Sequence, residues 1–214
     1  MKKFYVCLLI CIMLLTSTIS YSKEIDSKLM GKVIVIDPGH GGKDSGTSVG
    51  GVYEKDINLS ISLLLREELI KRGVTVLMTR DGDYDLSSPN TSRRKKSDFD
   101  NRINFINNSK ADLYLSIHIN YLDQGKYYGA QVFYTESNKF LANIVQKSFN
   151  TYLKSPMKEK ELSDKIYMYK KLNIPGLLLE CGFMSNSNER YNLQKKEYQK
   201  LIVDSIIKGL NKYY

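Results

Sequence analysis

The sequence predicts a single α/β domain in which a sheet is covered by helices on both faces. Short runs rich in Val, Ile and Leu alternate along the chain with longer segments whose apolar residues recur at helical spacing. The 214 residues contain no internal repeat and no linker long enough to separate two domains. With 42% hydrophobic and 26% charged residues, the chain has enough apolar material for one substantial core.

The first 22 residues are predicted to be a signal peptide, and residues 23–214 to be the folded domain. A basic start at Lys2 and Lys3 precedes an apolar run of twelve residues from Phe4 to Leu15, and small or hydroxylated residues follow. This is the order of a secretory signal, and the run is shorter than the roughly 20 residues that a membrane-spanning helix needs. Cleavage is expected near Ser20–Ser22. Retention of the segment as a membrane anchor is the alternative.

Export has consequences for disulfides and partners. Cleavage would remove two lysines and no acidic residue, which lowers the formal net charge from +9 to +7. Of the three cysteines only Cys181 would remain, so no intramolecular disulfide could form. A basic exported chain favours anionic partners such as cell-wall polymers, and export argues against nucleic acid as the partner.

The first half of the domain is predicted to alternate strands with helices. Lys32–Asp37 is rich in β-branched residues and is expected to form a buried strand, followed by a glycine-rich loop. Residues 56–72 place apolar side chains at helical spacing before Gly73, which predicts a helix ending at that glycine. The elements expected next are a strand, a polar loop, a helix and a third strand, at residues 74–79, 80–97, 98–108 and 112–117.

The second half is predicted to complete the sheet. Residues 129–135 alternate in polarity and predict a fourth strand, which a helix at 138–153 follows. A short strand is expected at 166–169. Residues 176–180 predict an apolar strand with an acidic tip, and residues 196–214 predict a closing helix.

Three reactive side chains are expected at one edge of this sheet. The chain has only two histidines: His40 lies in the loop after the first strand, and His118 ends the third. Glu180 ends the apolar strand at 176–180. Because the carboxyl ends of strands form the ligand-binding edge of an open α/β sheet, these side chains are expected to meet there.

The residue types indicate a metal site. A catalytic zinc is held by three protein ligands, often two histidines and a carboxylate, and keeps one position for water. With two histidines, the third ligand would be a carboxylate or Cys181, and Glu54 is the candidate because the glycine loop before it could fold back toward His40. Cys181 neighbours Glu180 in an extended segment, so it should face the core if Glu180 faces the cleft. Each residue alone also has an ordinary structural explanation; the set of four is what indicates an enzyme.

Other enzyme signatures are absent. The sequence has no complete phosphate-binding loop, no His-Glu-x-x-His motif and no Gly-x-Ser-x-Gly elbow. Four blocks instead resemble those of the N-acetylmuramoyl-L-alanine amidases of the zinc amidase-3 type. They are, in chain order, Val35–Gly42, Glu54–Lys55, Ser116–Asn120 and Leu179–Asn186.

This resemblance implies a fold and an activity. The fold is α/β, with a mixed, mostly parallel sheet covered by helices on both faces. His40, Glu54 and His118 would bind Zn²⁺, and Glu180 would be the catalytic acid/base. The implied reaction is hydrolysis, by zinc-activated water, of the amide between N-acetylmuramic acid and the L-alanine of the peptidoglycan stem peptide. A zinc peptidase acting on the stem peptide and a non-catalytic wall-binding regulator on the same fold are the rival hypotheses.

A narrower resemblance concerns residues 86–107, which are similar to the germination-specific, spore-cortex branch of that family. That branch removes stem peptides on the way to muramic-δ-lactam. The resemblance implies a location in the cell wall or spore cortex space and, in some bacteria, a lipoprotein activator. Asn120 and Arg102 are candidate substrate contacts. The other hypothesis for Arg102 is a pairing with an acid near the zinc.

Overall fold

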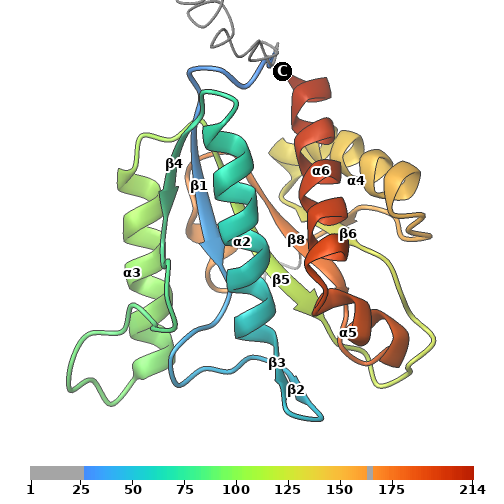
Figure 1. The fold of residues 1–214 in the computed structure, drawn as a ribbon. Coiled ribbons are helices and arrows are strands. Elements are labelled where there is room, and N and C mark those ends of the chain that lie inside the picture. Colours follow the sequence, from blue (N-terminus) through green and yellow to red (C-terminus); the bar gives the residue numbers. More distant parts are fainter. Residues whose placement is uncertain (1–26, 163–165) are drawn as a thin grey trace, which may run out of the picture.

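A six-stranded sheet forms the centre of the structure, a computed structural model that describes residues 27–162 and 166–214 (Figure 1). From one edge to the other the strands are β4 (Thr75–Met78), β1 (Val33–Pro38), β5 (Leu113–Asn120), β8 (Gly176–Phe183), β6 (Gln131–Tyr134) and β7 (Lys160–Glu161). The neighbours among β4, β1, β5 and β8 are parallel, whereas β6 runs antiparallel to β8. The prediction of a mixed, mostly parallel sheet is therefore confirmed.

Helices cover both faces, as predicted. Helices α2 (Glu54–Ile70), α4 (Lys139–Tyr152) and α6 (Lys196–Tyr213) lie on one face, and α3 (Arg94–Asn108) lies on the other (Figure 1). Smaller elements complete the described chain: the hairpin of β2 (Ser48–Val49) and β3 (Val52–Tyr53), the 3₁₀ turns η1 (Glu136–Asn138) and η2 (Tyr169–Lys171), and α5 (Ser187–Leu193). None of the helices in the described ranges is long and apolar enough to cross a membrane.

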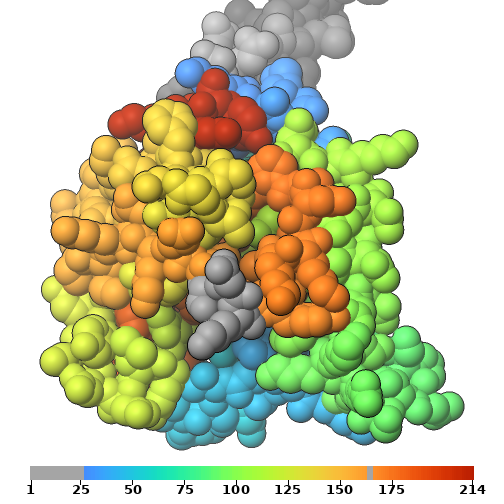
Figure 2. Space-filling model, turned by 180° about the vertical axis from the view of Figure 1, so that it is seen from behind, coloured from blue at the N-terminus to red at the C-terminus, as the bar shows by residue number. Residues whose placement is uncertain are grey.

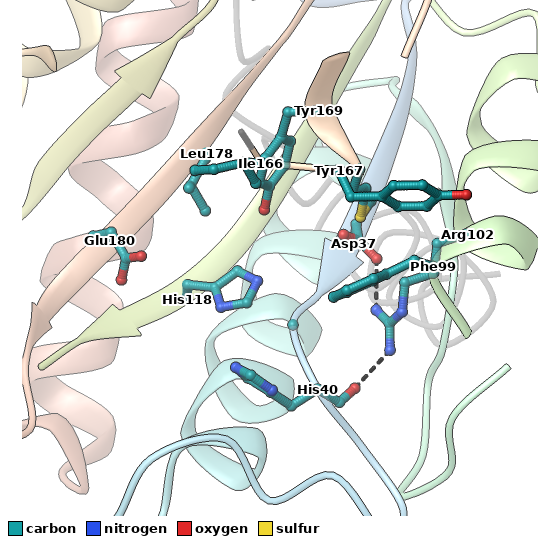
Figure 3. A pocket seen from close by; sticks show the side chains of 12 residues that line it. Asp37, His40, Phe99, Arg102, His118, Ile166, Tyr167, Tyr169, Leu178 and Glu180 are labelled. Atoms are coloured by element: carbon teal, nitrogen blue, oxygen red, sulfur yellow. Dashed lines mark hydrogen bonds and ion pairs between the residues drawn. The ribbon is translucent and has the colours of Figure 1, made fainter. Parts of the chain in front are cut away.

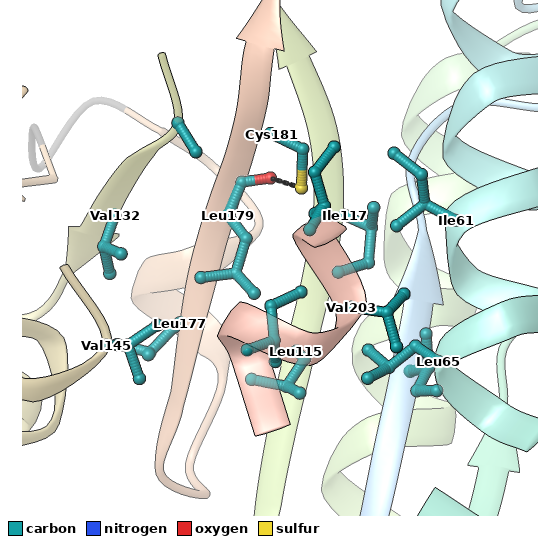
Figure 4. Close-up of a cluster of buried hydrophobic side chains, with 14 of the residues drawn as sticks. Ile61, Leu65, Leu115, Ile117, Val132, Val145, Leu177, Leu179, Cys181 and Val203 are labelled. Atoms are coloured by element: carbon teal, nitrogen blue, oxygen red, sulfur yellow. Dashed lines mark hydrogen bonds between the residues drawn. The ribbon is translucent and has the colours of Figure 1, made fainter. Parts of the chain in front are cut away.

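The period of two along the central strands divides the apolar side chains between a larger cluster on one face of the sheet and a smaller cluster on the other. Leu177, Leu179 and Cys181 of β8 pack into the larger hydrophobic cluster under α2 and α6, together with side chains of β5 (Figure 4). Leu178 belongs to the smaller cluster under α3. Because successive side chains alternate between faces, Glu180 lies on the same side as Leu178 and opposite Cys181.

Cys181 faces the core, as predicted, on the opposite face of β8 from Glu180. Its side chain is fully buried in the main cluster. Burial raises the pKa of the thiol far above its usual value, and the nearby Glu180 and Glu189 add to that rise. We expect Cys181→Ala to retain activity and to lower the free energy of unfolding by about 1–2 kcal/mol, through lost packing. Urea denaturation and a muropeptide assay check both parts. A large loss of activity in the folded variant would contradict this.

Two predicted segments were wrong. Residues 166–168 form a turn rather than a strand and lead into η2, which begins at Tyr169, and the described edge strand is β7. Instead of strand pairing, two hydrogen bonds to α3 hold residues 167–171 in place. Tyr167 Oη donates to Asp100 Oδ1 (2.6 Å), and Asn107 Nδ2 donates to Lys171 O (2.9 Å). The polar loop predicted over 80–97 ends earlier, since α3 begins at Arg94.

Candidate active site

The four candidate residues come from four segments that end at the same edge of the sheet. His118 lies in β5 and is the direct register partner of Glu180 in β8. His40 follows β1 after one intervening residue, and Glu54 is the first residue of α2. Figure 3 shows His40, His118 and Glu180 converging from their separate elements. The structure thus brings together all four.

Three of these side chains form a compact donor cluster. One ligand atom from each of His40, Glu54 and His118 can be chosen so that all lie within 4.8 Å of one another. Glu54 Oε1 is 3.2 Å from His40 Nε2 and 3.0 Å from His118 Nδ1. Two imidazole nitrogens and one carboxylate oxygen are the donor set of a catalytic zinc site with an open fourth position. The residues present therefore fit a zinc ion, and Cys181 lies on the opposite face of β8.

The glycine-rich loop closes tightly around this cluster. A Cβ atom on Gly39 would lie 2.2 Å from the ring of His118. A Cβ atom on Gly46 would lie 2.6 Å from both Glu54 Oε2 and His40 Cδ2, and Gly46 also has a positive φ of 63°. Glycine at these two positions allows the backbone to approach the donor cluster without a clash.

Glu54 is held as a carboxylate. Its oxygens accept hydrogen bonds from the backbone of Thr47 (2.9 Å) and Ile119 (3.2 Å). Burial alone would raise the pKa of Glu54, but hydrogen bonds to His118 and His40, with the charges of those rings, hold it well below its usual range. A carboxylate that stays ionised is the form that binds a metal.

Asp44 contacts His40, although it was not among the site residues predicted from the sequence. Its Oδ2 lies 3.0 Å from His40 Nδ1, on the side of the ring away from Glu54. Burial alone would lower the pKa of His40, but the hydrogen bonds to Asp44 and Glu54 and the charges of both acids raise it to about 9. The only signal in the sequence was weak: Asp44 is an acidic residue four positions after His40. Whether the two side chains meet depends on how the glycine-rich loop folds.

Glu180 sits beside the donor cluster, with one buried oxygen that no described residue satisfies. Its Oε2 atom is buried and has no hydrogen-bond partner among the residues that the structure describes. Burial, with the negative charge of Glu54 adding to it, raises the pKa of Glu180 to about 8, although His40 opposes the rise. Burying a polar atom without a partner is costly, so this oxygen indicates a place where a ligand would supply the missing hydrogen bond.

Two hollows meet at His40, His118 and Glu180. One, of about 430 Å³, is open and polar, and Asn120 and Lys95 lie on its wall. The other, of about 230 Å³, has a mainly apolar wall between α3 and residues 166–169 (Figure 3). Figure 2 shows the segment from residue 166 onward, in orange, lying beside the green residues of α3. The cluster is thus reached from two sides.

Arg102 borders the smaller, mainly apolar hollow rather than the open polar one. Its side chain is 2% exposed. Its guanidinium donates to Asp37 Oδ1 (2.7 Å) and to the carbonyl of His40 (2.6 Å), as Figure 3 shows. It also donates to Asp98 Oδ2 (2.9 Å) and to the carbonyl of Pro38 (2.8 Å). Burial alone would raise the pKa of Asp37, but Arg102 and hydrogen bonds from two hydroxyls hold it below its usual value. Of the two hypotheses for Arg102, this geometry favours pairing with an acid near the site.

Breaking this buried network should be costly. We expect Arg102→Met to lower the free energy of unfolding by about 3–5 kcal/mol, because it leaves the carboxylates of Asp37 and Asp98 buried without their cation. Lys96→Met is the matched control, since Lys96 pairs with Asp100 at the same helical spacing on the exposed side of α3. Urea denaturation of both variants measures the difference. Equal, small losses would contradict a structural role for Arg102.

Comparison with known proteins identifies relatives over nearly the whole described chain. The model of the N-acetylmuramoyl-L-alanine amidase family matches residues 34–212. The germination-specific N-acetylmuramoyl-L-alanine amidase of Bacillus subtilis is 38% identical over 192 residues, which are 87% of this chain and 81% of that protein.

Solved structures share the fold. The CwlD amidase from Clostridioides difficile, in complex with the GerS lipoprotein, superposes with a TM-score of 0.80 at 38% identity, covering 85% of this chain and 98% of that one. The catalytic domain of CwlV, an N-acetylmuramoyl-L-alanine amidase from Bacillus (Paenibacillus) polymyxa var. colistinus, superposes with a TM-score of 0.74 at 28% identity, covering 85% and 97%.

Proposed function

The chain belongs to the N-acetylmuramoyl-L-alanine amidase family and is a peptidoglycan amidase, and we propose that it works through a zinc ion held by His40, Glu54 and His118, with Glu180 as acid/base. The observation that carries the proposal is the position of Glu180. Its buried, unpartnered oxygen borders the same hollows as the two histidines of the donor cluster. The substrate bond is the amide between N-acetylmuramic acid and L-alanine.

The four side chains divide the work of hydrolysis. A bound zinc ion lowers the pKa of water and polarises a carbonyl group. Glu180 takes a proton from the attacking water as the new carbon–oxygen bond forms at the substrate carbonyl. The same carboxyl group then donates that proton to the L-alanine nitrogen as the carbon–nitrogen bond breaks. The products are a lactyl carboxylate on the sugar and a peptide with a free amino group.

The hollows suggest how the substrate is placed. Asn120 lies two residues after His118 on β5 and borders the open polar hollow. Because side chains two apart on a strand point to the same face, Asn120 can contact a substrate whose amide lies at His118. We propose Asn120 as a substrate contact. Arg102 would act indirectly, by holding the backbone carbonyl of His40.

Location and partners are proposed from the relatives and from the N-terminal sequence. A basic start and a twelve-residue apolar run support export by a signal peptide, with the cell wall or spore cortex as the destination. That segment lies outside the described residues. Similarity to a germination-specific amidase supports a role in spore-cortex maturation, in which stem peptides are removed before muramic-δ-lactam forms. The CwlD amidase is solved in complex with a lipoprotein, which supports a lipoprotein as a candidate partner here.

Product analysis tests the proposed reaction. Purified glycan strands with intact stem peptides should yield peptides that begin with a free L-alanine amino group, and muramic acid that has lost its peptide. Mass spectrometry of the digest, with and without a zinc chelator, identifies both products. A peptidase would leave L-alanine on the sugar, and a non-catalytic wall-binding protein would give no product; either result would overturn the proposal.

A further inference from the structure

We propose that Asp44 is a positioning residue that fixes the orientation of His40 and the location of its ring proton, so that Nε2 presents its lone pair to the metal. The inference rests on the proposed function, because it concerns the same zinc site. Asp44 would not bind zinc or substrate. It would act through His40.

The two nitrogens of His40 have different partners. Nδ1 lies 3.0 Å from Asp44 Oδ2, and Nε2 lies 3.2 Å from Glu54 Oε1. A carboxylate only accepts hydrogen bonds, so contact with Asp44 places the proton of a neutral ring on Nδ1. Nε2 is then left free toward the donor cluster. Carboxylates behind metal-binding histidines commonly fix the tautomer in this way and raise the basicity of the ligand.

The backbone holds Asp44 in place for this task. Asp44 and Gly41 exchange two backbone hydrogen bonds, of 2.9 Å and 3.0 Å, which close the loop around His40. The other carboxylate oxygen of Asp44 accepts from the backbone of Gly46 (3.1 Å). Hydrogen bonds therefore hold both the backbone of Asp44 and the carboxylate oxygen that does not contact His40.

His40 needs such support more than His118 does. His118 lies inside β5, where β8 fixes its backbone by direct register with Glu180. His40 lies in the loop with a positive φ of 62°, a conformation that non-glycine residues rarely adopt. Its carbonyl is held by Arg102 and its ring by Asp44. Asp44 thus restrains the ring of His40 through a side-chain contact, whereas the sheet restrains His118 through its backbone.

Zinc affinity measures this role directly. We expect Asp44→Ala to bind zinc about 10–100-fold more weakly than the wild-type protein, the usual scale for losing such a partner. Asp44→Asn should lose less, because its amide oxygen can still accept the Nδ1 proton. Asp83→Ala is the matched control: Asp83 also accepts a backbone hydrogen bond from this loop, at Gly42 (2.8 Å), and pairs with Lys55 rather than with a histidine. Competition with a chromophoric chelator gives all four affinities.

Exchange of the Nδ1 proton of His40 with solvent gives a second measurement. It would not change if Asp44 only stabilised the loop. With only two histidines in the chain, the imidazole signals of the ¹⁵N-labelled, zinc-saturated protein can be assigned with one variant. The Nδ1 proton of His40 should be protected from exchange in the wild-type protein and in Asp44→Asn, and exposed in Asp44→Ala.

The outcomes separate this inference from the proposed function. Wild-type affinity for zinc in Asp44→Ala, or a protected proton in that variant, would overturn the role of Asp44 alone. A wild-type protein that binds zinc as described but does not cleave the muramoyl amide would overturn the proposed function alone. A wild-type protein that binds no zinc would overturn both.

Discussion

Replacing Glu180 with glutamine should lower the rate of amide hydrolysis by at least ~10²-fold, the usual scale for losing a general acid–base. Glutamine keeps the size and shape of the side chain but cannot accept and return a proton. The donor cluster of His40, Glu54 and His118 does not include Glu180, so the variant should keep its zinc. Steady-state kinetics on muropeptides, with zinc content from elemental analysis, measures both effects.

Glu189→Gln is the matched control for this experiment. Glu189 is a second buried carboxylate near the end of β8, and it accepts hydrogen bonds from the backbone of Gly129 and Phe183 instead of facing the hollows. The control should change stability rather than turnover. Near-normal turnover in Glu180→Gln would refute the acid/base role. Loss of zinc together with activity would mean that Glu180 is a ligand, and Glu54 would need another role.

Replacing His118 with alanine should remove most of the bound zinc and, with it, the activity. The substitution leaves His40 and Glu54 as the remaining donors of the cluster, and two ligands hold zinc far more weakly than three. Asn120→Ala is the matched control, because it removes a polar side chain two residues further along the same strand and outside the donor cluster. The control should keep its zinc and raise KM.

Elemental analysis after dialysis against a weak chelator distinguishes the two variants. One zinc per chain is expected for the wild-type protein and for Asn120→Ala, and a small fraction of one for His118→Ala. Full occupancy in His118→Ala would remove this histidine from the proposed ligand set.

The sheet and its reactive edge could be predicted because they follow from local patterns. A β-branched run predicted β1, and short, mainly apolar runs predicted β5 and β8. Parallel strands end at one edge of a sheet, which brought His118 and Glu180 together. The approach of Glu54 to both histidines was less predictable from spacing. It depends on the closure of a glycine loop, which local sequence patterns do not determine.

The features that were missed depend on tertiary contacts or on a weak signal. The burial of Arg102 was not predicted, and it depends on Asp37 and Asp98, which both pair with its guanidinium. Helix α5 was not predicted, although Asn186 followed three residues later by Glu189 has the form of a helix cap, and the structure shows Glu189 N donating to Asn186 Oδ1 (3.0 Å).

The most direct test of the proposed site is a crystal of the zinc-loaded protein measured on both sides of the zinc absorption edge. We predict one anomalous peak, at about 2.0–2.2 Å from His40 Nε2, His118 Nδ1 and a carboxylate oxygen of Glu54. Glu180 should lie beyond bonding distance, on the side where the substrate amide would bind. A peak at another set of residues, or a zinc ion bonded to Glu180, would contradict the proposed ligand set and the division of roles within it.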